Sequence, residues 1–290
     1  MKWITEMAKD VAAAPKSSLP AHLQGGKTHK FGNTDSSDII IPRVKLLQAI
    51  SPEVEEHNDA KAGNFWHTIA AENLGATIKG VPILVRKSFV LWSPRGDDRG
   101  VLARANDGKN WDNADMEFTV KPKNSPHPVT YKLGKTVHDR VGDGPALSEF
   151  GSSIPGDSNS PPAAALTYQL LWFFPDHPEM SPSIIINTRS GVKPAKGLIS
   201  RIDMMPVDSY GQMYDIGVNK VPFEDGYFYN YKYTAAGYAD EDTYNTCKAL
   251  YDSFSTSSWR ANDEHEDEEV GTGGGGDKPR GTGKSDSDKF

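Results

Sequence analysis

The sequence predicts a mainly β protein of the β-rich α+β class, folded as a small barrel or sandwich with long loop insertions and a few short helices. Two observations carry this prediction. Short segments rich in Val, Ile, Phe and Tyr recur along the chain and are separated by polar stretches. The 290 residues include 27 glycines and 20 prolines, which indicates many turns and loops. The sequence has no internal repeat with a period of about 20 to 50 residues, so a solenoid or a propeller is excluded.

Composition divides the chain into three parts. Residues 1–38 hold one short helix-forming stretch and then a polar segment broken by glycine and proline, which predicts a flexible N-terminal arm. Residues 39–258 carry most of the apolar side chains and are predicted to form a single domain. Residues 259–290 contain few apolar side chains and four successive glycines, which predicts a disordered acidic tail.

The first half of the body contains one clear β segment. "IIIPRVKLLQAISPEV" predicts an extended entry followed by a short helical turn, because Pro42 disfavours a central strand. "ATIKGVPILVRKSFVLW" predicts a strand that ends at the turn "SPRG". Val81, Ile83, Val85 and Phe89 occupy alternate positions of this strand, and Arg86, Val90 and Trp92 share its opposite face. The following residues, to about 162, predict short strands joined by long loops.

The second half of the body predicts three units. "AAALTYQLLWFFPD" is apolar throughout, so its periodicity does not distinguish a buried strand from a short helix. "PSIIINTRSGVKPAKGLISRIDMM" predicts a strand, a basic glycine turn and a helix. Residues 210–238 predict two strands joined by a turn at "FEDG". "ADEDTYNTCKALYDSF" predicts a short amphipathic helix whose acidic start suits the positive helix N-terminus.

A run of tyrosines raises the question of function. Tyr227, Tyr229, Tyr231 and Tyr233 alternate in "DGYFYNYKY", so a strand would place all four rings on one face. Such a row serves either as core packing or as a platform on which flat ligands stack. We name this row the tyrosine ladder. Exposed rings and cations are what single-stranded nucleic acid requires, and the candidate binding residues are Arg86, Lys87, Phe89, Trp92, Arg95, Arg99, Arg104, Arg189, Lys193, Lys196, Arg201 and the four ladder tyrosines.

Other site chemistries have weaker support in the sequence. "NTRSGVKPAKG" has neither the GxGxxG nor the P-loop spacing, so it indicates either a helix entry with exposed lysines or a simple phosphate contact. His57, His67 and His138 lack the spacing of metal sites, and the chain shows no nucleophile elbow. We therefore expect no enzyme activity, no metal and no cofactor.

The apolar runs are too short to cross a bilayer, and the N-terminus lacks the apolar region of a signal peptide. A single cysteine, Cys247, excludes an internal disulfide and fits a reducing compartment. These features predict a cytoplasmic protein that does not bind membranes.

The C-terminal residues carry most of the net charge. Nine acidic and four basic residues lie between 261 and 290, and they supply most of the chain's net charge of −7. Such a tail can lie in the protein's own cationic groove, dock on a partner through its terminal aromatic ring, or only increase solubility. The candidate partner-binding residues of the tail are Asp263, Glu264, Glu266, Asp267, Glu268, Glu269, Asp286, Asp288 and Phe290.

With these features the chain resembles the bacteriophage single-stranded DNA-binding proteins, which have an OB-fold and an acidic C-terminal tail ending in phenylalanine. The resemblance is carried by "DEDTYNTCKALYDSF", "NDEHEDEE" and the closing "DSDKF", and by "IPRVKLLQAISPEV" and "FVLWSPRG". Lys284 and Lys289 depart from the family, whose tails are nearly uninterrupted acids.

The resemblance implies an OB-like barrel that coats single-stranded DNA during replication or recombination in the cytoplasm of an infected host cell. It also implies a tail that modulates DNA binding and recruits a phage polymerase, helicase or nuclease, and it allows a homodimer. Two alternatives stay open. The loops, prolines and terminal segments also suit a structural or assembly protein of a tailed-phage virion, and a dispersed site gathering histidines with carboxylates would indicate an enzyme.

Overall fold

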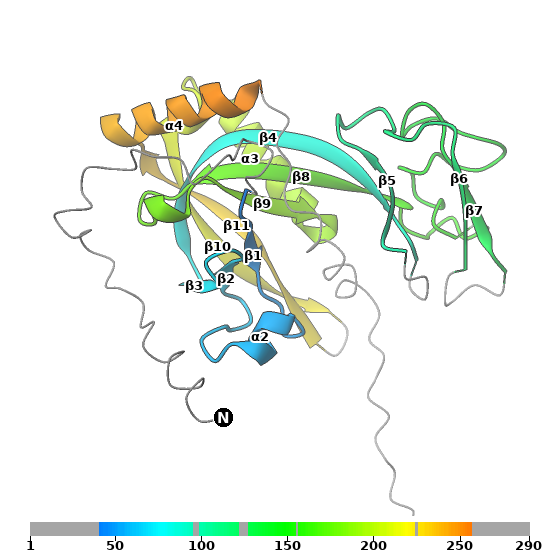
Figure 1. Cartoon of the computed structure of the whole chain (residues 1–290), viewed down its shortest axis with the longest axis horizontal. Helices are drawn as coiled ribbons and strands as arrows, with labels where there is room; N and C mark the ends of the chain where they lie inside the picture. Colours follow the sequence, from blue (N-terminus) through cyan, green and yellow to red (C-terminus); the bar gives the residue numbers. More distant parts are fainter. Residues whose placement is uncertain (1–40, 95–98, 122–126, 155, 224–225, 257–290) are drawn as a thin grey trace, which may run out of the picture. The chain divides into compact units, whose positions relative to one another are not determined.

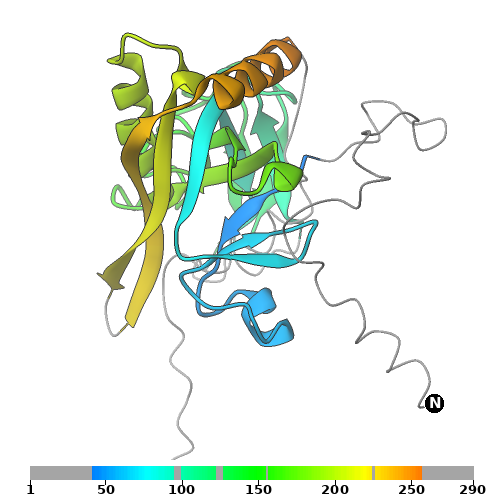
Figure 2. The same cartoon turned by 90° about the vertical axis from the view of Figure 1, so that its left-hand side faces the viewer.

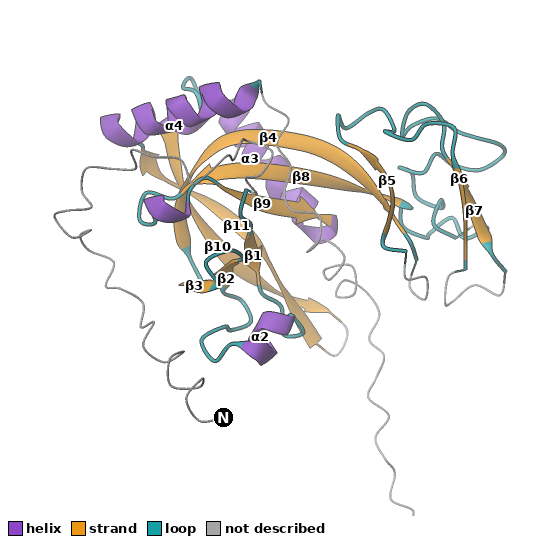
Figure 3. Ribbon diagram, in the orientation of Figure 1, coloured by secondary structure: helices purple, strands orange, loops and turns teal. Residues whose placement is uncertain are grey.

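The computed structural model describes residues 41–94, 99–121, 127–154, 156–223 and 226–256. The chain divides into two units, Met1–Ile39 and Ile40–Phe290, and the described residues belong to the second. They are mainly β (Figures 1 and 3). The strands are β1 (Val44–Leu46), β2 (Phe65–His67), β3 (Glu72–Gly75), β4 (Ile78–Trp92), β5 (Val101–Ala105), β6 (Glu117–Val120), β7 (Val129–Lys132), β8 (Ala164–Phe173), β9 (Ser183–Thr188), β10 (Gln212–Phe223) and β11 (Gly226–Tyr238). The helices are α2 (Pro52–Glu56), α3 (Val192–Asp203) and α4 (Glu241–Ser255), with short 3₁₀ turns η2 (Pro178–Met180), η3 (Arg189–Gly191) and η4 (Ser209–Gly211).

The main sheet is antiparallel and has the strand order β11-β10-β4-β8-β9, with β5 also pairing with β4. β4 is a single strand of 15 residues, as its sequence predicted. The segment that the sequence left undecided forms β8, which is paired on both sides by β4 and β9. Its continuous apolar run therefore reflects burial on both faces. Between the described strands the order does not close, so the predicted OB-like barrel is not confirmed.

A bulge in β4 changes which side chains face the same way. The pairing with β8 shifts between Pro82 and Leu84, which inserts Ile83 as an extra residue. Val81 and Ile83 consequently point to one face of the sheet, whereas Val85 and Phe89 point to the other. The sequence prediction that these four residues share one face is wrong, because simple alternation does not survive a bulge.

Two cores cover the two faces of the main sheet. The α3-side core contains Phe65, Trp172, Tyr214 and Ile216, and α3 adds Ala195 and Leu198 to it. The α4-side core lies on the opposite face and contains Val81, Ile83, Leu171, Ile184 and Cys247. In Figure 1, α4 lies across the left-hand end of β4, and its fully buried Cys247 packs there in the α4-side core. The burial of Cys247 raises the pKa of its thiol to about 12, so this cysteine stays a packed, neutral side chain.

A further core surrounds the far ends of β4 and β8. It contains Phe89, Leu91, Trp111, Tyr131 and Val137, and it packs β4 against β5 and the β6–β7 hairpin. We call it the β5–β7 core. β4 and β8 therefore each run from the sheet of the first two cores to this third one, as Figure 1 shows.

One short segment connects the two edge strands of the main sheet. At one end, the Pro42 carbonyl accepts a hydrogen bond from the Ile184 amide of β9 (2.8 Å), and Arg43 forms a parallel bridge with Ile184. At the other end, the side chain of Gln48 hydrogen-bonds to the main chain of Tyr229 in β11. Residues 42–48, which include β1, thus lie against both edges. The sequence predicted the extended entry correctly but placed a helical turn at Leu46 and Leu47, where the structure has the end of β1.

The remaining predictions for the second half agree with the structure. The strand, basic glycine turn and helix are β9, η3 and α3, and the paired strands are β10 and β11. Helix α4 begins after Asp240, whose carboxylate accepts a hydrogen bond from the Thr243 amide (2.8 Å). This N-cap satisfies one of the free N–H groups of the first turn and lowers the pKa of Asp240. The predicted N-terminal arm and acidic tail lie outside the described residues.

Candidate nucleic-acid interface

The tyrosine ladder lies on one face of β11, as predicted, but that face turns toward the α3-side core. Tyr229, Tyr231 and Tyr233 are half-buried and pack against this core, whereas Tyr227 is 49% exposed. Tyr231 and Tyr233 stack on each other with ring centroids 6.1 Å apart and 5° between their planes. Most of the ladder is therefore packing, and its rings are not a free platform for bases.

Tyr233 is the ladder tyrosine with the most specific contacts in the core. Its ring stacks on Trp172 at 5.8 Å, and its hydroxyl donates to Asn187 Oδ1 at 2.8 Å. Burial raises the pKa of Tyr233 well above its usual value, and the negative field of a neighbouring ionised Tyr231 would act in the same direction. Tyr233 is thus a neutral hydrogen-bond donor that joins β11 to β9.

The β10–β11 hairpin extends past the sheet. β10 pairs with β4 only at Tyr214–Ile216, so the hairpin beyond these residues has two strands (Figure 2). Near its end, Phe223 is 45% exposed and the Lys220 ammonium lies 3.4 Å from the centre of the Tyr227 ring. This cation–π pair covers one face of the most exposed ladder ring.

The most unusual exposure on the main sheet lies at the middle of β4 and β8. We call residues 84–88 of β4 and the residues paired with them, 167–171 of β8, the midspan. Val85 is 42% exposed and Lys87 is exposed. Among the described strands, only β8 pairs with β4 along the midspan, because β10 pairs at Ile78–Gly80 and β5 pairs at Phe89–Trp92. The midspan lies between the α3-side core and the β5–β7 core, and neither covers it fully.

A row of three side chains crosses the midspan on its α3 side. Lys87 pairs with Tyr168 across β4 and β8, and Tyr168 pairs with Asn187 across β8 and β9. Paired residues of neighbouring strands point to the same face, so the three side chains form a line. Strands lie about 4.8 Å apart, which makes this line about 10 Å long. We call it the Lys87–Tyr168–Asn187 row.

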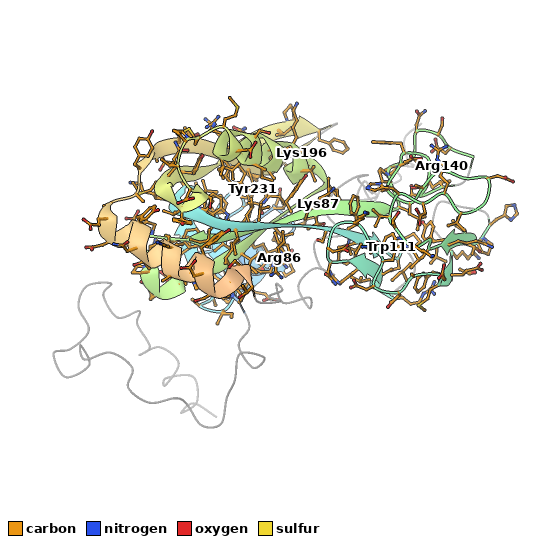
Figure 4. All side chains as sticks on the ribbon, turned by 90° about the horizontal axis from the view of Figure 1, so that it is seen from above. Arg86, Lys87, Trp111, Arg140, Lys196 and Tyr231 are labelled. Carbon is orange, nitrogen blue, oxygen red and sulfur yellow. The ribbon has the colours of Figure 1, made fainter. Side chains whose placement is uncertain are left out.

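The other face of the midspan is polar as well. Arg86 pairs with Gln169, and Ser88 pairs with Thr167. Arg86 is half-buried, and burial lowers the pKa of its guanidinium, which nevertheless stays charged near neutral pH. In Figure 4, Arg86 and Lys87 lie on β4, between Tyr231 of β11 on one side and Trp111, which follows β5, on the other. Adjacent cations on one strand therefore face opposite sides of the sheet.

The remaining predicted residues of β4 and β5 are distributed differently. Phe89 is 5% exposed in the β5–β7 core, so the prediction of a solvent-facing ring at this position is wrong. Phe89 shares its face with the exposed Val85 and Lys87, and the β5–β7 core covers it at its end of the strand. Trp92 and Arg104 are half-buried, and the Arg99 guanidinium donates to the Thr119 carbonyl oxygen at 2.7 Å. Arg95 lies outside the described residues.

The predicted cations after β9 lie on η3 and α3. Arg189, Lys193, Lys196 and Arg201 are all exposed. Arg189 has a backbone φ of 49°, an uncommon conformation for a residue other than glycine that marks the sharp turn from β9 into the helix. Lys193 and Lys196 are one turn apart on α3, the helix that packs against β8 and β9, and Figure 4 labels Lys196.

Sequence reasoning missed two members of the row. Tyr168 lies in an apolar run that concealed its position on a face, and Asn187 was treated only as part of the "NTRSG" turn. A signal was present for Asn187, since an amide inside a strand of isoleucines requires a buried partner. That partner is Tyr233, which is distant in sequence.

The three histidines singled out in the sequence each contact a different partner. His57 packs on Trp66, His67 contacts Ser183, and His138 Nδ1 lies 2.9 Å from Ser148 Oγ. The neighbouring Asp139 carboxylate instead accepts hydrogen bonds from Thr136. Over the described part of the chain, no group of three or more His, Cys, Asp and Glu side chains is placed to hold a metal ion.

No helix within the described ranges has the length and apolar character needed to cross a membrane. The predicted partner-binding residues of the tail, Asp263 to Phe290, lie outside those ranges.

Comparison with known proteins places the chain in a phage family. No curated protein and no solved structure matches it. A family model described as the Pam3 phage gp34-like protein matches residues 11–260, which is most of the chain and includes every described residue. On this match, the chain belongs to the Pam3 phage gp34-like family.

Proposed function

We propose that the protein binds single-stranded DNA without sequence preference during phage DNA replication or recombination, in the cytoplasm of the infected host cell. The observation that carries this proposal is the cross-strand pair of Lys87, which is exposed, and Tyr168, which is half-buried, on one face of the midspan. The pair combines a cation and an aromatic ring, the groups that neutralise a phosphate and stack a base. Asn187 continues the row but is fully buried, and its Oδ1 accepts the Tyr233 hydroxyl.

The location of the row suits a strand that crosses the sheet. Lys87 and Val85 are exposed between two cores, so a chain lying there contacts β4 without displacing packed side chains. Lys193 and Lys196 of α3 extend the positive charge beside it. A base stacked on Tyr168 would contribute about 1–3 kcal/mol, and the cations would make binding sensitive to salt.

An OB-type relationship stays part of the proposal. Its support is a main sheet of antiparallel strands whose two edges are brought into contact with residues 42–48. OB-folds are five-stranded barrels that are partly open and bind oligonucleotides on one face. The row lies on the α3-side face of the main sheet, and its candidate binding groups come from β4 and β8 rather than from the ladder.

The acidic tail is proposed to modulate this binding and to recruit replication proteins such as a polymerase, helicase or nuclease. Its net negative charge would compete with DNA for the cations of the midspan and α3. Deleting residues 261–290 is therefore expected to tighten DNA binding at low salt. Equal affinity of the full-length and truncated proteins would remove the tail from the proposal. A homodimer, which the resemblance allows, would be measured on the same samples by light scattering.

The experiment that tests the function is a titration of labelled oligothymidine, followed by fluorescence anisotropy at increasing salt concentrations. We expect binding of single strands at low salt, weaker binding of a duplex, and a linear fall of log K with log salt. Lys87→Gln is expected to lower the affinity and reduce the salt slope by about one. Lys248→Gln, at an exposed lysine on α4, is the matched control and should leave both unchanged. The absence of single-strand binding at low salt would overturn the proposed function.

One observation favours a second candidate, a structural or assembly protein of the virion. Several large apolar side chains are strongly exposed, among them Met204 (83%), Phe150 (69%) and Tyr238 (63%). Contact with neighbouring subunits in a virion would cover these side chains, as it covers contiguous apolar patches at protein–protein interfaces. Finding the chain in purified particles, together with no oligonucleotide binding, would decide for this candidate.

A further inference from the structure

The middle of β4 has one edge on which no described strand pairs. On its other edge, β8 pairs with β4 along the whole midspan. On this edge, β10 pairs only with Ile78–Gly80 and β5 only with Phe89–Trp92. An unpaired edge presents main-chain N–H and C=O groups in a row, which makes it a template for another strand.

Two short segments mark the ends of this stretch. At one end, the Ser209 hydroxyl of η4 donates a hydrogen bond to the Ile83 carbonyl oxygen at 3.0 Å. At the other end, the turn after β5 lies against Lys87, because a Cβ added to Gly108 would lie 2.9 Å from the Lys87 carbonyl oxygen. Residues 84–86 remain between them, and they span about 10 Å at the usual rise of a strand. We call residues 84–86 and their unpaired edge the β4 gap.

The main-chain groups of Val85 point into the β4 gap. Alternate residues of an antiparallel strand direct their N–H and C=O groups to the same edge. The Lys87 carbonyl faces this edge, as its contact with Gly108 shows, and no register shift separates Lys87 from Val85. Within the described ranges, no turn or loop pairs with the Val85 main chain there. Val85 therefore offers one donor and one acceptor at the same place.

The β4 gap lies on an uncovered part of the strand. Val85 is 42% exposed and Lys87 is exposed. Figure 1 shows β4 above β8 along this stretch. In the view from above (Figure 4), no other described ribbon crosses β4 where Arg86 and Lys87 are labelled. A segment in extended conformation can thus approach this edge.

Cations flank the β4 gap on both faces of the sheet. Lys87 points to the α3 side, whereas Arg86 and Leu84 point to the α4 side. A segment that pairs antiparallel would place one residue opposite Val85, the preceding residue opposite Arg86 and the following residue opposite Leu84. An acidic residue suits the position opposite Arg86, and a second acid before it would lie near Lys87. Apolar residues suit the positions opposite Val85 and Leu84.

We propose that the β4 gap docks an extended segment of a partner protein in which two acidic residues precede an apolar residue. The Val85 N–H donates to the carbonyl of this apolar residue, and the Val85 carbonyl accepts from the N–H of the same residue. These main-chain hydrogen bonds hold the segment, and Arg86 and Lys87 select its acidic side chains. The docking does not require DNA, so it goes beyond the proposed function.

The test measures labelled peptides on the full chain by fluorescence anisotropy. The probe is fluorescein-Ser-Glu-Glu-Val-Leu-Ser-amide, which carries the proposed order of side chains. Its matched control has a methyl group on the valine nitrogen, which removes the N–H that donates to the Val85 carbonyl and changes no charge. We expect this methyl group to weaken binding about tenfold. A third peptide, with glutamine in place of both glutamates, tests the contribution of charge and should also bind more weakly.

Two measurements test the protein side of the contact. Arg86→Gln is expected to weaken probe binding about threefold, whereas Lys248→Gln on α4 should leave it unchanged. Hydrogen exchange of the Val85 amide in the natural chain should become slower when the unlabelled probe is bound, because its N–H then donates to the peptide. This second readout does not depend on any substitution.

The chain's own tail is the competing occupant. Glu268, Glu269 and Val270 have the same order of two acids and an apolar residue. Probe binding that appears only after Glu268→Gln and Glu269→Gln are introduced into the full chain would assign the β4 gap to this tail and overturn the partner segment.

The remaining outcomes separate strand addition from simple charge attraction. Equal binding of the probe and its N-methyl control, or unchanged exchange at Val85, overturns strand addition at the β4 gap. Equal binding of the glutamate and glutamine peptides overturns the choice of an acidic segment. Oligothymidine binding is measured separately. Its absence with peptide binding intact overturns only the proposed function, and the reverse result overturns only this inference.

Discussion

Gln48 and Tyr229 pair like two residues of neighbouring strands, although one partner is a side chain. Gln48 Nε2 donates to the Tyr229 carbonyl oxygen at 2.9 Å, and the Tyr229 N–H donates to Gln48 Oε1, also at 2.9 Å. The amide thus occupies the outer edge of β11 where another strand would pair. The ring of Tyr229 also packs closely against Gly63, where an added Cβ would lie 2.7 Å from the ring.

Replacing this amide should loosen the edge of the sheet. Gln48→Met keeps the length of the side chain but removes both hydrogen bonds, and we expect it to lower the free energy of unfolding by about 1–2 kcal/mol. Urea titration of the natural chain and the variant measures this difference. Asn245→Ala, at an exposed position on α4, is the control with an expected change near zero. Equal stability of Gln48→Met and the natural chain would show that the pair does not hold the edge.

The hydroxyl of Tyr233 should contribute more to the stability of the fold than the hydroxyl of Tyr227. Tyr233→Phe keeps the stack on Trp172 but leaves Asn187 Oδ1 buried without its donor, so we expect a loss of about 1–3 kcal/mol. Tyr227→Phe removes the same atom from an exposed ring and should be nearly neutral. Thermal unfolding of the two variants is the measurement. If both variants unfold like the natural chain, the Tyr233–Asn187 hydrogen bond is not a structural link between β11 and β9.

The ladder shows where sequence reasoning succeeds and where it stops. Alternation along β11 correctly predicted that Tyr227, Tyr229, Tyr231 and Tyr233 share a face, because strand periodicity is local. Whether that face meets water depends on Phe65 and Trp172, which come from other strands. Local periodicity carries no information on these contacts. Because Tyr231 packs against the α3-side core, Tyr231→Ala is expected to destabilise the fold.

The strands of the main sheet show the same difference between local features, which the sequence predicts, and non-local features, which it does not. β4, β9, β10 and β11 were predictable because each has β-rich composition and a turn beside it. The bulge at Ile83 was not, and neither was the β5–β7 core, which buries Phe89 although it shares a face with the exposed Val85. The Lys87 ammonium lies 5.3 Å from the centre of the Phe89 ring, and its cross-strand neighbour is Tyr168. Cross-strand pairing, which is non-local, determined that neighbour.

Stability should fall in acid because of His67. Burial lowers the pKa of this imidazole, against smaller raising effects of the Met180 backbone, Glu72 and Glu179. The folded state then binds a proton less readily than the unfolded state, whose histidine pKa is about 6.5. The contribution of the neutral ring is therefore complete above this value and is lost as the pH falls below it. Urea midpoints between about pH 7.5 and 5 measure the decline.

The variant His67→Asn tests whether His67 causes the loss of stability in acid. The ring accepts a hydrogen bond from the Ala70 amide at Nδ1 (2.9 Å), and its Nε2 lies 3.3 Å from Ser183 Oγ. Asparagine is shorter and does not titrate, so it should lower stability at neutral pH and flatten the decline in acid. A decline that is unchanged in His67→Asn would assign the acid sensitivity to another group.

Substitutions at Tyr168 should separate the contribution of base stacking to oligothymidine affinity from the contribution of charge. Tyr168→Leu removes the ring and keeps an apolar side chain against the α3-side core, so we expect oligothymidine affinity to fall by about 1–3 kcal/mol at every salt concentration. The salt slope should stay unchanged, because no cation is lost. Tyr168→Phe retains the stacking face and should bind like the natural chain. Anisotropy titrations at several salt concentrations distinguish this pattern from that of Lys87→Gln, which changes the slope. If Tyr168→Leu binds as tightly as Tyr168→Phe, no base stacks at the midspan and binding there is due to charge alone.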